Sequence, residues 1–141
     1  MSNSEPAGAS ESEPDPEVVE LATRVFDLAR RGETDLLAAY LDAGLPVNLT
    51  NDKGDTLVML AAYHGHARTA ALLCEHGADP DRLNDRGQSP LAGAVFKGAD
   101  EVVDVLVDHG ADPDAGTPSA RDAARLFEKD HYLQRFAGDQ T

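Results

Sequence analysis

The 141-residue chain contains no tryptophan, and its three tyrosines and four phenylalanines bring the aromatic content to only 5%. Hydrophobic residues still account for 41% of the sequence, which is ordinary for a globular protein. The core must therefore be built from alanine, leucine and valine, as closely packed short helices require. A chain of this length suits one domain with one continuous core.

Cysteine is nearly absent: Cys74 stands alone, so it cannot form an internal disulfide or anchor a metal ion by itself. We expect it to be a small core side chain. No apolar run is long enough to cross a bilayer. Residues 1–17 have neither lysine nor arginine and no apolar block, which is unlike a secretory signal. These features favour a cytoplasmic protein with no membrane association.

Basic residues are scarce, with 12 lysines and arginines against 26 aspartates and glutamates and a net charge of −14. Nucleic acids and anionic membranes are bound through basic surfaces, so neither is expected as a partner. The acidic excess keeps identical copies apart, and we expect the chain to be monomeric by itself. The same acidic excess could instead serve to attract a basic partner or to mimic a nucleic acid.

The most informative feature present is an internal repeat, because residues 51–83 and 84–116 are two copies of one 33-residue unit. Twelve of the 33 aligned positions are identical. Gly65 aligns with Gly98, and Gly32 lies another 33 residues before Gly65. A fixed period of this length indicates a solenoid, in which each unit buries its apolar faces against its neighbours.

Each unit predicts two short helices separated by a glycine. Ser89 and Pro90 give a helix start, Asp100 is expected to cap a helix over 101–108, and Gly110 is expected to end that helix. An acidic tail rich in serine and proline precedes the units and is expected to be disordered. The expected segments are the tail (1–16), a capping repeat (17–50), two repeats (51–83 and 84–116) and a truncated cap (117–137).

The motifs Gly54-x-Thr56, Ala61-Ala62-x-x-Gly65-His66 and Leu72-Leu73-x-x-x-Gly77-Ala78-Asp79 resemble the ankyrin repeat. The third unit adds Ser89-Pro90-Leu91, although both units lack the histidine of the family's T-P-L-H tetrapeptide. The resemblance covers roughly residues 17–137 and suggests a small, stand-alone bacterial member. It implies an all-α ankyrin-repeat solenoid of about four stacked helix-turn-helix units with β-turn fingers. Both terminal units would be degenerate caps, and the concave face would bind proteins.

In the ankyrin family, partner-reading residues lie on the fingers and at the exposed end of each first helix. Mapped onto this chain, that row gives a cation or an aromatic residue in four successive units, and these residue types dominate interface energies. The alternative is that the rings pack inward and the cations only face solvent. The expected partner-binding residues are Arg30, Arg31, Asp52, Lys53, Asp55, Tyr63, His64, Asp85, Arg86, Gln88, Phe96, Lys97 and Arg125.

These observations predict a non-enzymatic interaction module that binds another protein as an adaptor, an inhibitor or a chaperone-like cofactor. No phosphate loop, nucleophile elbow or catalytic triad is visible, so neither enzyme activity nor a cofactor is expected. A first alternative is self-association through the last unit, whose signature would be exposed Leu126, Phe127, Tyr132 and Phe136. A second alternative is a metal-dependent hydrolase that uses His64 and His66. The remaining histidines and the Asp-Pro-Asp turns are expected to be structural.

Overall fold

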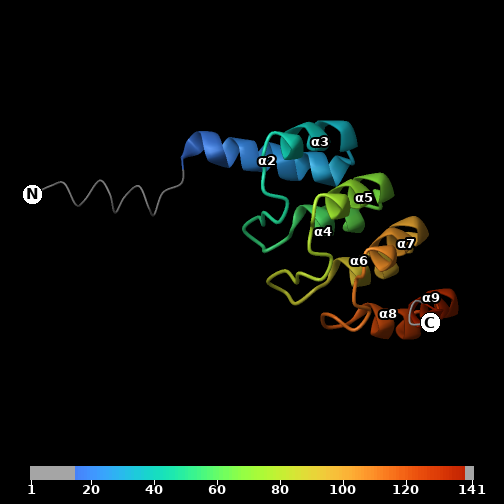
Figure 1. The fold of residues 1–141 in the computed structure, drawn as a ribbon. Coiled ribbons are helices and arrows are strands. Elements are labelled where there is room, and N and C mark those ends of the chain that lie inside the picture. Colours follow the sequence, from blue (N-terminus) through green and yellow to red (C-terminus); the bar gives the residue numbers. More distant parts are fainter. Residues whose placement is uncertain (1–14, 139–141) are drawn as a thin grey trace, which may run out of the picture.

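The computed structural model describes residues 15–138, which form four helical pairs stacked side by side (Figure 1). The inner helices pack in succession along the stack, and the outer helices lie behind them. The described residues contain no strand, only an isolated antiparallel bridge between Thr50 and Thr56. The predicted all-α solenoid is therefore confirmed. The pairs are α2 (Pro16–Arg31) with α3 (Thr34–Asp42), α4 (Leu57–Tyr63) with α5 (Ala67–Glu75), α6 (Pro90–Lys97) with α7 (Asp100–Asp108), and α8 (Ala120–Leu126) with α9 (Asp130–Gly138).

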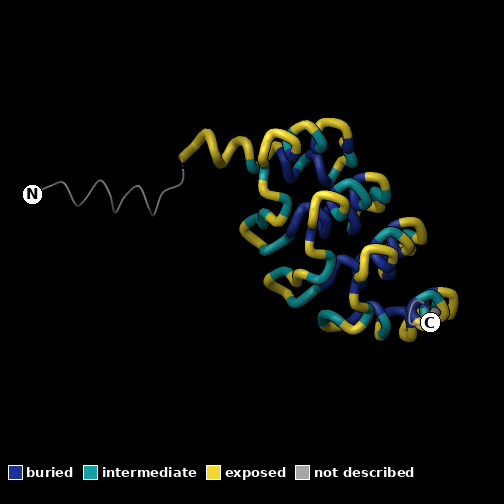
Figure 2. The backbone as a smooth tube through the Cα atoms, in the orientation of Figure 1, coloured by how far each residue is buried: buried dark blue, intermediate teal, exposed yellow. Residues whose placement is uncertain are grey.

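One continuous core runs between the inner and outer helices along the whole stack (Figure 2). The two central inner helices supply most of it, with residues 57–62 and 91–95 buried. Alanines at 61, 62 and 94 keep the inner helices close together, which explains how a core with so few aromatic residues is filled. Cys74 packs against this core, and burial raises the pKa of its thiol to about 11. It is therefore a poor nucleophile at neutral pH.

Each of the inner helices α4, α6 and α8 follows a residue with a buried side-chain hydroxyl. Thr56 accepts a hydrogen bond from the N–H of Met59 at 3.1 Å, and Ser89 accepts one from the N–H of Ala92 at 3.0 Å. Ser119 repeats the contact in the last unit. These bonds satisfy backbone donors that would otherwise be unpaired at the helix N-terminus.

The ends of the inner helices share a left-handed residue. Gly32, Gly65 and Gly98 have φ angles of 72°, 78° and 75°, and they occupy equivalent positions in three successive units. In the last unit the same position is taken by Glu128, with φ 56°. This left-handed residue comes nine positions after the capping hydroxyl in each of the last three units, so the units keep a common register at their helix ends.

The fingers between the units project to one side of the stack and are joined to one another (Figure 1). Asn51 and Asn84 hold their own turns, because each side-chain oxygen accepts from two backbone N–H groups further along. The side-chain nitrogen of Asn84 reaches back and donates to Asp55 at 2.9 Å. The N–H of Asp85 also donates to the carbonyl of Lys53 at 3.0 Å. Neighbouring fingers therefore form one connected edge.

Two helix starts differ from expectation. The α7 helix begins at Asp100 itself, with Ala99 as N-cap and no side-chain cap, because the Asp100 carboxylate instead accepts a hydrogen bond from the Tyr132 hydroxyl. The α2 helix begins at Pro16 and is capped by Asp15, one residue before the expected start. Residues 1–14 of the expected acidic tail lie outside the described residues. No helix within 15–138 is long and apolar enough to cross a membrane.

Candidate functional site

The inner face consists of the C-terminal ends of the inner helices together with the fingers. Tyr63 is the residue that connects these two parts. It ends α4, and its ring lies against the backbone of Gly93 in α6, where an added Cβ would collide with it. The ring is half-buried, and burial, helped by the charge of Asp55, raises the pKa of its hydroxyl. Tyr63 therefore packs between two units while still lining the surface.

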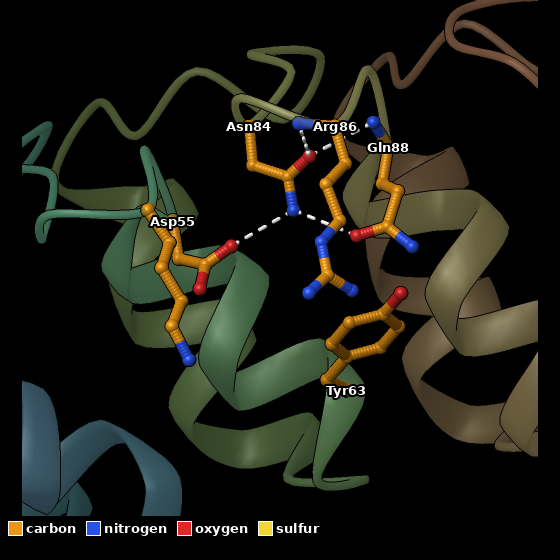
Figure 3. A pocket seen from close by; sticks show the side chains of 6 residues that line it. Asp55, Tyr63, Asn84, Arg86 and Gln88 are labelled. Atoms are coloured by element: carbon orange, nitrogen blue, oxygen red, sulfur yellow. Dashed lines mark hydrogen bonds between the residues drawn. The ribbon is translucent and has the colours of Figure 1, made fainter.

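On one side of Tyr63 lies a polar hollow of about 140 Å³, here called the finger pocket (Figure 3). Asn84 forms its back wall, since its side-chain nitrogen donates to Asp55 at 2.9 Å and to Gln88 at 2.8 Å. The Arg86 side chain extends toward Tyr63. The pocket thus has a hydrogen-bonded wall and cationic groups at its mouth. Its lining residues are Lys53, Asp55, Tyr63, Asn84, Arg86 and Gln88.

On the other side of Tyr63 lies a mostly apolar hollow of about 170 Å³, here called the aromatic hollow. Phe96 forms its rim with 70% of its surface exposed. The Phe96 ring meets that of Phe127 edge-on, with 5.3 Å between the centroids. This arrangement is favourable for aromatic pairs, yet it leaves one face of Phe96 in solvent. The hollow is lined by Tyr63, Gln88, Ala92, Gly93, Phe96, Pro118 and Ala123.

Cationic groups follow the helix ends next to the aromatic hollow. The pKa of His64 is lowered, first by partial burial and then by the positive charges of His66, Lys97 and Arg30. The Lys97 side chain reaches back over the preceding unit, since its Cε would lie 3.9 Å from a Cβ on Gly65. Arg30 and Lys97 thus place positive charge on either side of His64, and the lowered pKa favours the neutral form of that histidine.

The last unit presents different residues from those expected. Since Glu128 takes the position of the repeat glycine, Leu126 and Phe127 align with Phe96 and Lys97. Leu126 is 73% exposed, so the row ends in an apolar group. Arg125 lies one position earlier and pairs with Asp122 of its own helix at 3.7 Å. The sequence indicated a slip of about four residues in the last unit, which placed the row one residue early, because the caps of α6 and α8 are 30 residues apart where those of α4 and α6 are 33 apart.

The structure brings most of the expected site residues together, but it leaves several apart. Arg31 pairs with Asp27 on its own helix, and neither Arg31 nor the exposed Asp52 lines either hollow. Asp85 packs against Gly54 of the preceding finger. Gly93 and Asn84 were not anticipated. A glycine within an apolar helix was the available signal for Gly93, because such a residue often marks a close approach.

The histidines have structural partners in this fold. The His66 ring nitrogen Nε2 lies 2.7 Å from the carbonyl oxygen of Arg30, which ties the start of α5 to the preceding unit. His76 and His109 each bond a carbonyl in the last turn of their outer helix, at 3.0 and 2.9 Å. Within residues 15–138, no three side chains of the metal-binding types gather into a site. In the expected self-association signature, Tyr132 and Phe136 are buried.

Comparison with known proteins places these features in a family context. The profile of ankyrin repeats in three copies matches residues 25–117. An ankyrin-repeat protein of Pseudomonas aeruginosa is 53% identical over 58 residues, which cover 41% of this chain and 34% of that protein. The HOS4 protein of Saccharomyces cerevisiae is 39% identical over 56 residues, 39% of this chain and 5% of that one. The chain thus spans about a third or less of these relatives. The crystal structure of the human ASB11 ankyrin-repeat domain matches with a TM-score of 0.61 and 28% identity, covering 63% of this chain and 40% of that domain.

Proposed function

Because this chain belongs to the ankyrin-repeat family, whose repeats are protein–protein interaction modules, we propose that it binds another protein through its inner face. In this proposal the chain has no catalytic role and acts as an adaptor, an inhibitor or a chaperone-like cofactor in the cytoplasm. The net charge of −14 supports a chain that remains monomeric until it meets its partner.

The observation that carries this proposal is the exposure of Phe96. A phenylalanine with 70% of its surface in water contributes little to folding, although it is held against Phe127 at the edge of an apolar hollow. Contiguous exposed apolar surface on a small protein commonly marks an interaction site. An aromatic anchor buried by a partner is worth about 2 kcal/mol or more. The finger pocket beside it supplies polar groups that fix a partner's orientation.

The proposal is tested by using the full chain as bait in cells of its own organism, with quantitative mass spectrometry of the captured proteins. We expect Phe96→Ala to lose the proteins that the unchanged chain captures, while its thermal unfolding stays nearly the same. Leu36→Ala is the matched control, because Leu36 is also exposed, by 53%, but lies on an outer helix. If Phe96→Ala and Leu36→Ala capture the same proteins as the unchanged chain, the inner face is not the binding surface.

Self-association is a second candidate, and exposed Leu126 and Phe127 at the last unit favour it. Light scattering over a range of concentrations separates the two functions. A molecular mass that rises with concentration, and that falls back in Leu126→Ser, would support assembly. A constant monomer mass would leave only heterologous binding.

A further inference from the structure

The inner face carries several cations that have no ionic partner among the described residues, whereas those of the outer helices are paired. Both arginines within the outer helices bind carboxylates of the preceding unit: Arg68 pairs with Asp35 at 3.0 Å, and Arg135 pairs with Asp104 at 3.2 Å. By contrast, four inner-face cations make no ion pair with any residue of the described range 15–138. These four are Arg30, Lys53, Arg86 and Lys97.

Within residues 15–138, Arg24, Arg82 and Lys129 also make no ion pair, so the four inner-face cations are distinguished by their position beside the two hollows. Carboxylates are abundant enough to pair with every cation, and the outer helices show such pairing between units. Cations that stay unpaired on one face are therefore available to an outside anion. Complementary charge of this kind selects partners and speeds their association.

The unpaired cations lie on both sides of the aromatic hollow. Lys53 and Arg86 line the finger pocket, which shares Tyr63 and Gln88 with that hollow. Lys97 follows Phe96 at the opposite rim, with His64 and Arg30 beyond it. A ligand that places an apolar group in the hollow would have cations on its finger side and on its helix-end side.

The size of the hollow fits one large side chain. Its volume is about 170 Å³, and an apolar cavity of about 150 Å³ is known to accommodate benzene. A leucine or phenylalanine side chain is of this size. Because the hollow is open along the inner face, the flanking residues of such a ligand would continue along the surface in both directions.

We propose that the inner face recognises an extended acidic protein segment, which inserts one large apolar side chain between Tyr63 and Phe96. This inference rests on the proposed function. Carboxylates on either side of that side chain bind Arg86 and Lys53 at one end and Lys97 and Arg30 at the other. A nucleic acid fits less well, because its dense row of phosphates exceeds what four cations neutralise, and the net charge of −14 repels it more strongly than a short segment with few carboxylates. Residues 1–14 of this chain are acidic, but their one large apolar side chain, Met1, is four residues from the nearest carboxylate at Glu5, so they match this pattern less well.

The experiment is a selection of random peptides displayed on phage against the immobilised full chain at physiological salt. We expect enriched peptides to combine aspartate or glutamate with a single leucine, isoleucine or aromatic residue. One such peptide, synthesised with a fluorophore, is then titrated by anisotropy. Phe96→Ala should weaken its binding by about 30-fold, and Lys97→Glu by about 10-fold. Raising the NaCl concentration should weaken the binding as well.

Two matched variants on the outer helices serve as controls. Arg68→Glu makes the same charge reversal as Lys97→Glu at an exposed arginine, and Leu36→Ala removes an exposed apolar side chain. Both should bind the peptide within about twofold of the unchanged chain, because an exposed ion pair contributes little to stability. Equal losses in the controls and in the inner-face variants would overturn the proposal.

The remaining outcomes separate this proposal from the proposed function. Basic or uncharged peptides whose binding is still lost in Phe96→Ala would overturn the acidic specificity and leave the inner face as the binding surface. Acidic peptides that bind equally well to Phe96→Ala would overturn both. No enrichment at all would overturn recognition of a linear segment, while the capture experiment would still decide the proposed function. Peptides that bind only after residues 1–14 are removed would identify the chain's own terminus as the occupant and overturn an outside partner.

Discussion

A single left-handed residue follows each inner helix. It is a glycine in the first three units and Glu128 in the last. Glu128 has a φ of 56°. A left-handed conformation costs a residue with a Cβ about 1–2 kcal/mol. The last unit therefore closes its inner helix under backbone strain that the others avoid.

We expect Glu128→Gly to stabilise the chain by about 0.5–1 kcal/mol, because relief of the strain exceeds the extra entropy that glycine loses on folding. The reverse change, Gly98→Ala, should destabilise the chain, although nothing lies within 4 Å of the added Cβ. The midpoints of urea unfolding measure both effects. A Glu128→Gly variant that is less stable than the unchanged chain would contradict this assignment of strain.

The contact between the Tyr63 ring and Gly93 also has a measurable effect on stability. An alanine normally stabilises a helix by about 1 kcal/mol relative to glycine. In the unchanged chain, however, Gly93→Ala should destabilise the fold by about 1–3 kcal/mol, because its Cβ meets the Tyr63 ring. In a Tyr63→Ala background the same change should be stabilising.

The double-mutant cycle, measured by chemical unfolding, reports this change of sign. The equivalent position in α4 is Leu60, so the preceding unit offers no matched glycine, and the effect of Gly93→Ala must be compared within the cycle. A Gly93→Ala effect that is the same in both backgrounds would mean that the tyrosine ring does not occupy this position in solution.

At the scale of helices, the last pair is attached to the stack by a polar contact between α7 and α9. The Tyr132 hydroxyl donates to the Asp100 carboxylate, and this bond, more than the nearby His131, holds the pKa of Asp100 below its usual value. Burial raises the pKa of Tyr132 itself, so its hydroxyl stays protonated as a donor. A lowered carboxyl pKa stabilises the fold above the ordinary aspartate pKa of about 3.9.

We expect Tyr132→Phe to raise the pKa of Asp100 towards its ordinary value and to lower the thermal midpoint at neutral pH. Since this stabilisation is lost as the pH falls through the lowered pKa, the two proteins should become more alike in acid. Carbon-13 NMR titration of the Asp100 carboxyl gives the pKa, and thermal scans over the same pH range give the stability. An unchanged Asp100 pKa in Tyr132→Phe would show that the hydrogen bond is not formed in solution.

The helices were largely accessible to prediction because they repeat. The hydroxyl cap at Ser89 and the left-handed Gly110 are local signals, and both lie where the sequence indicated. Asp100 was wrongly predicted from the sequence to be a helix cap. Its carboxylate instead accepts a hydrogen bond from the hydroxyl of Tyr132 in α9, and a contact with a residue 32 positions away cannot be predicted from local sequence. The register of the last unit was likewise hidden, because Glu128 stands where the glycine that marks the other units is expected.

For the molecule as a whole, the 33-residue repeat predicted that successive units stack in order. The shape of the inner face could not be predicted, because it depends on side-chain directions that a sequence does not show. The sequence named Tyr63 and Phe96, but it did not show that one packs on Gly93 while the other stays exposed. The ion pairs of Arg68 and Arg135, and the lack of one within residues 15–138 at Arg30, Lys53, Arg86 and Lys97, also require coordinates.

The net charge of −14 leads to a prediction for the entire fold. Raising NaCl from about 10 to about 150 mM shortens the screening length from about 30 to about 8 Å. Because like charges repel across the compact stack, we expect the thermal midpoint to rise by a few degrees. The exposed ion pairs that salt also weakens contribute little. KCl should act as NaCl does, and a midpoint that falls with either salt would contradict net repulsion as the dominant effect.

The joined fingers have a consequence for how this molecule could change over time. The finger pocket takes Lys53 and Asp55 from one copy and Arg86 and Gln88 from the next, so under the proposed function the junction between copies would define what is recognised. Replacing a single internal copy would therefore alter two neighbouring junctions at once. New specificities would arise most economically from exchanges on both sides of one junction, with the aliphatic interior left untouched.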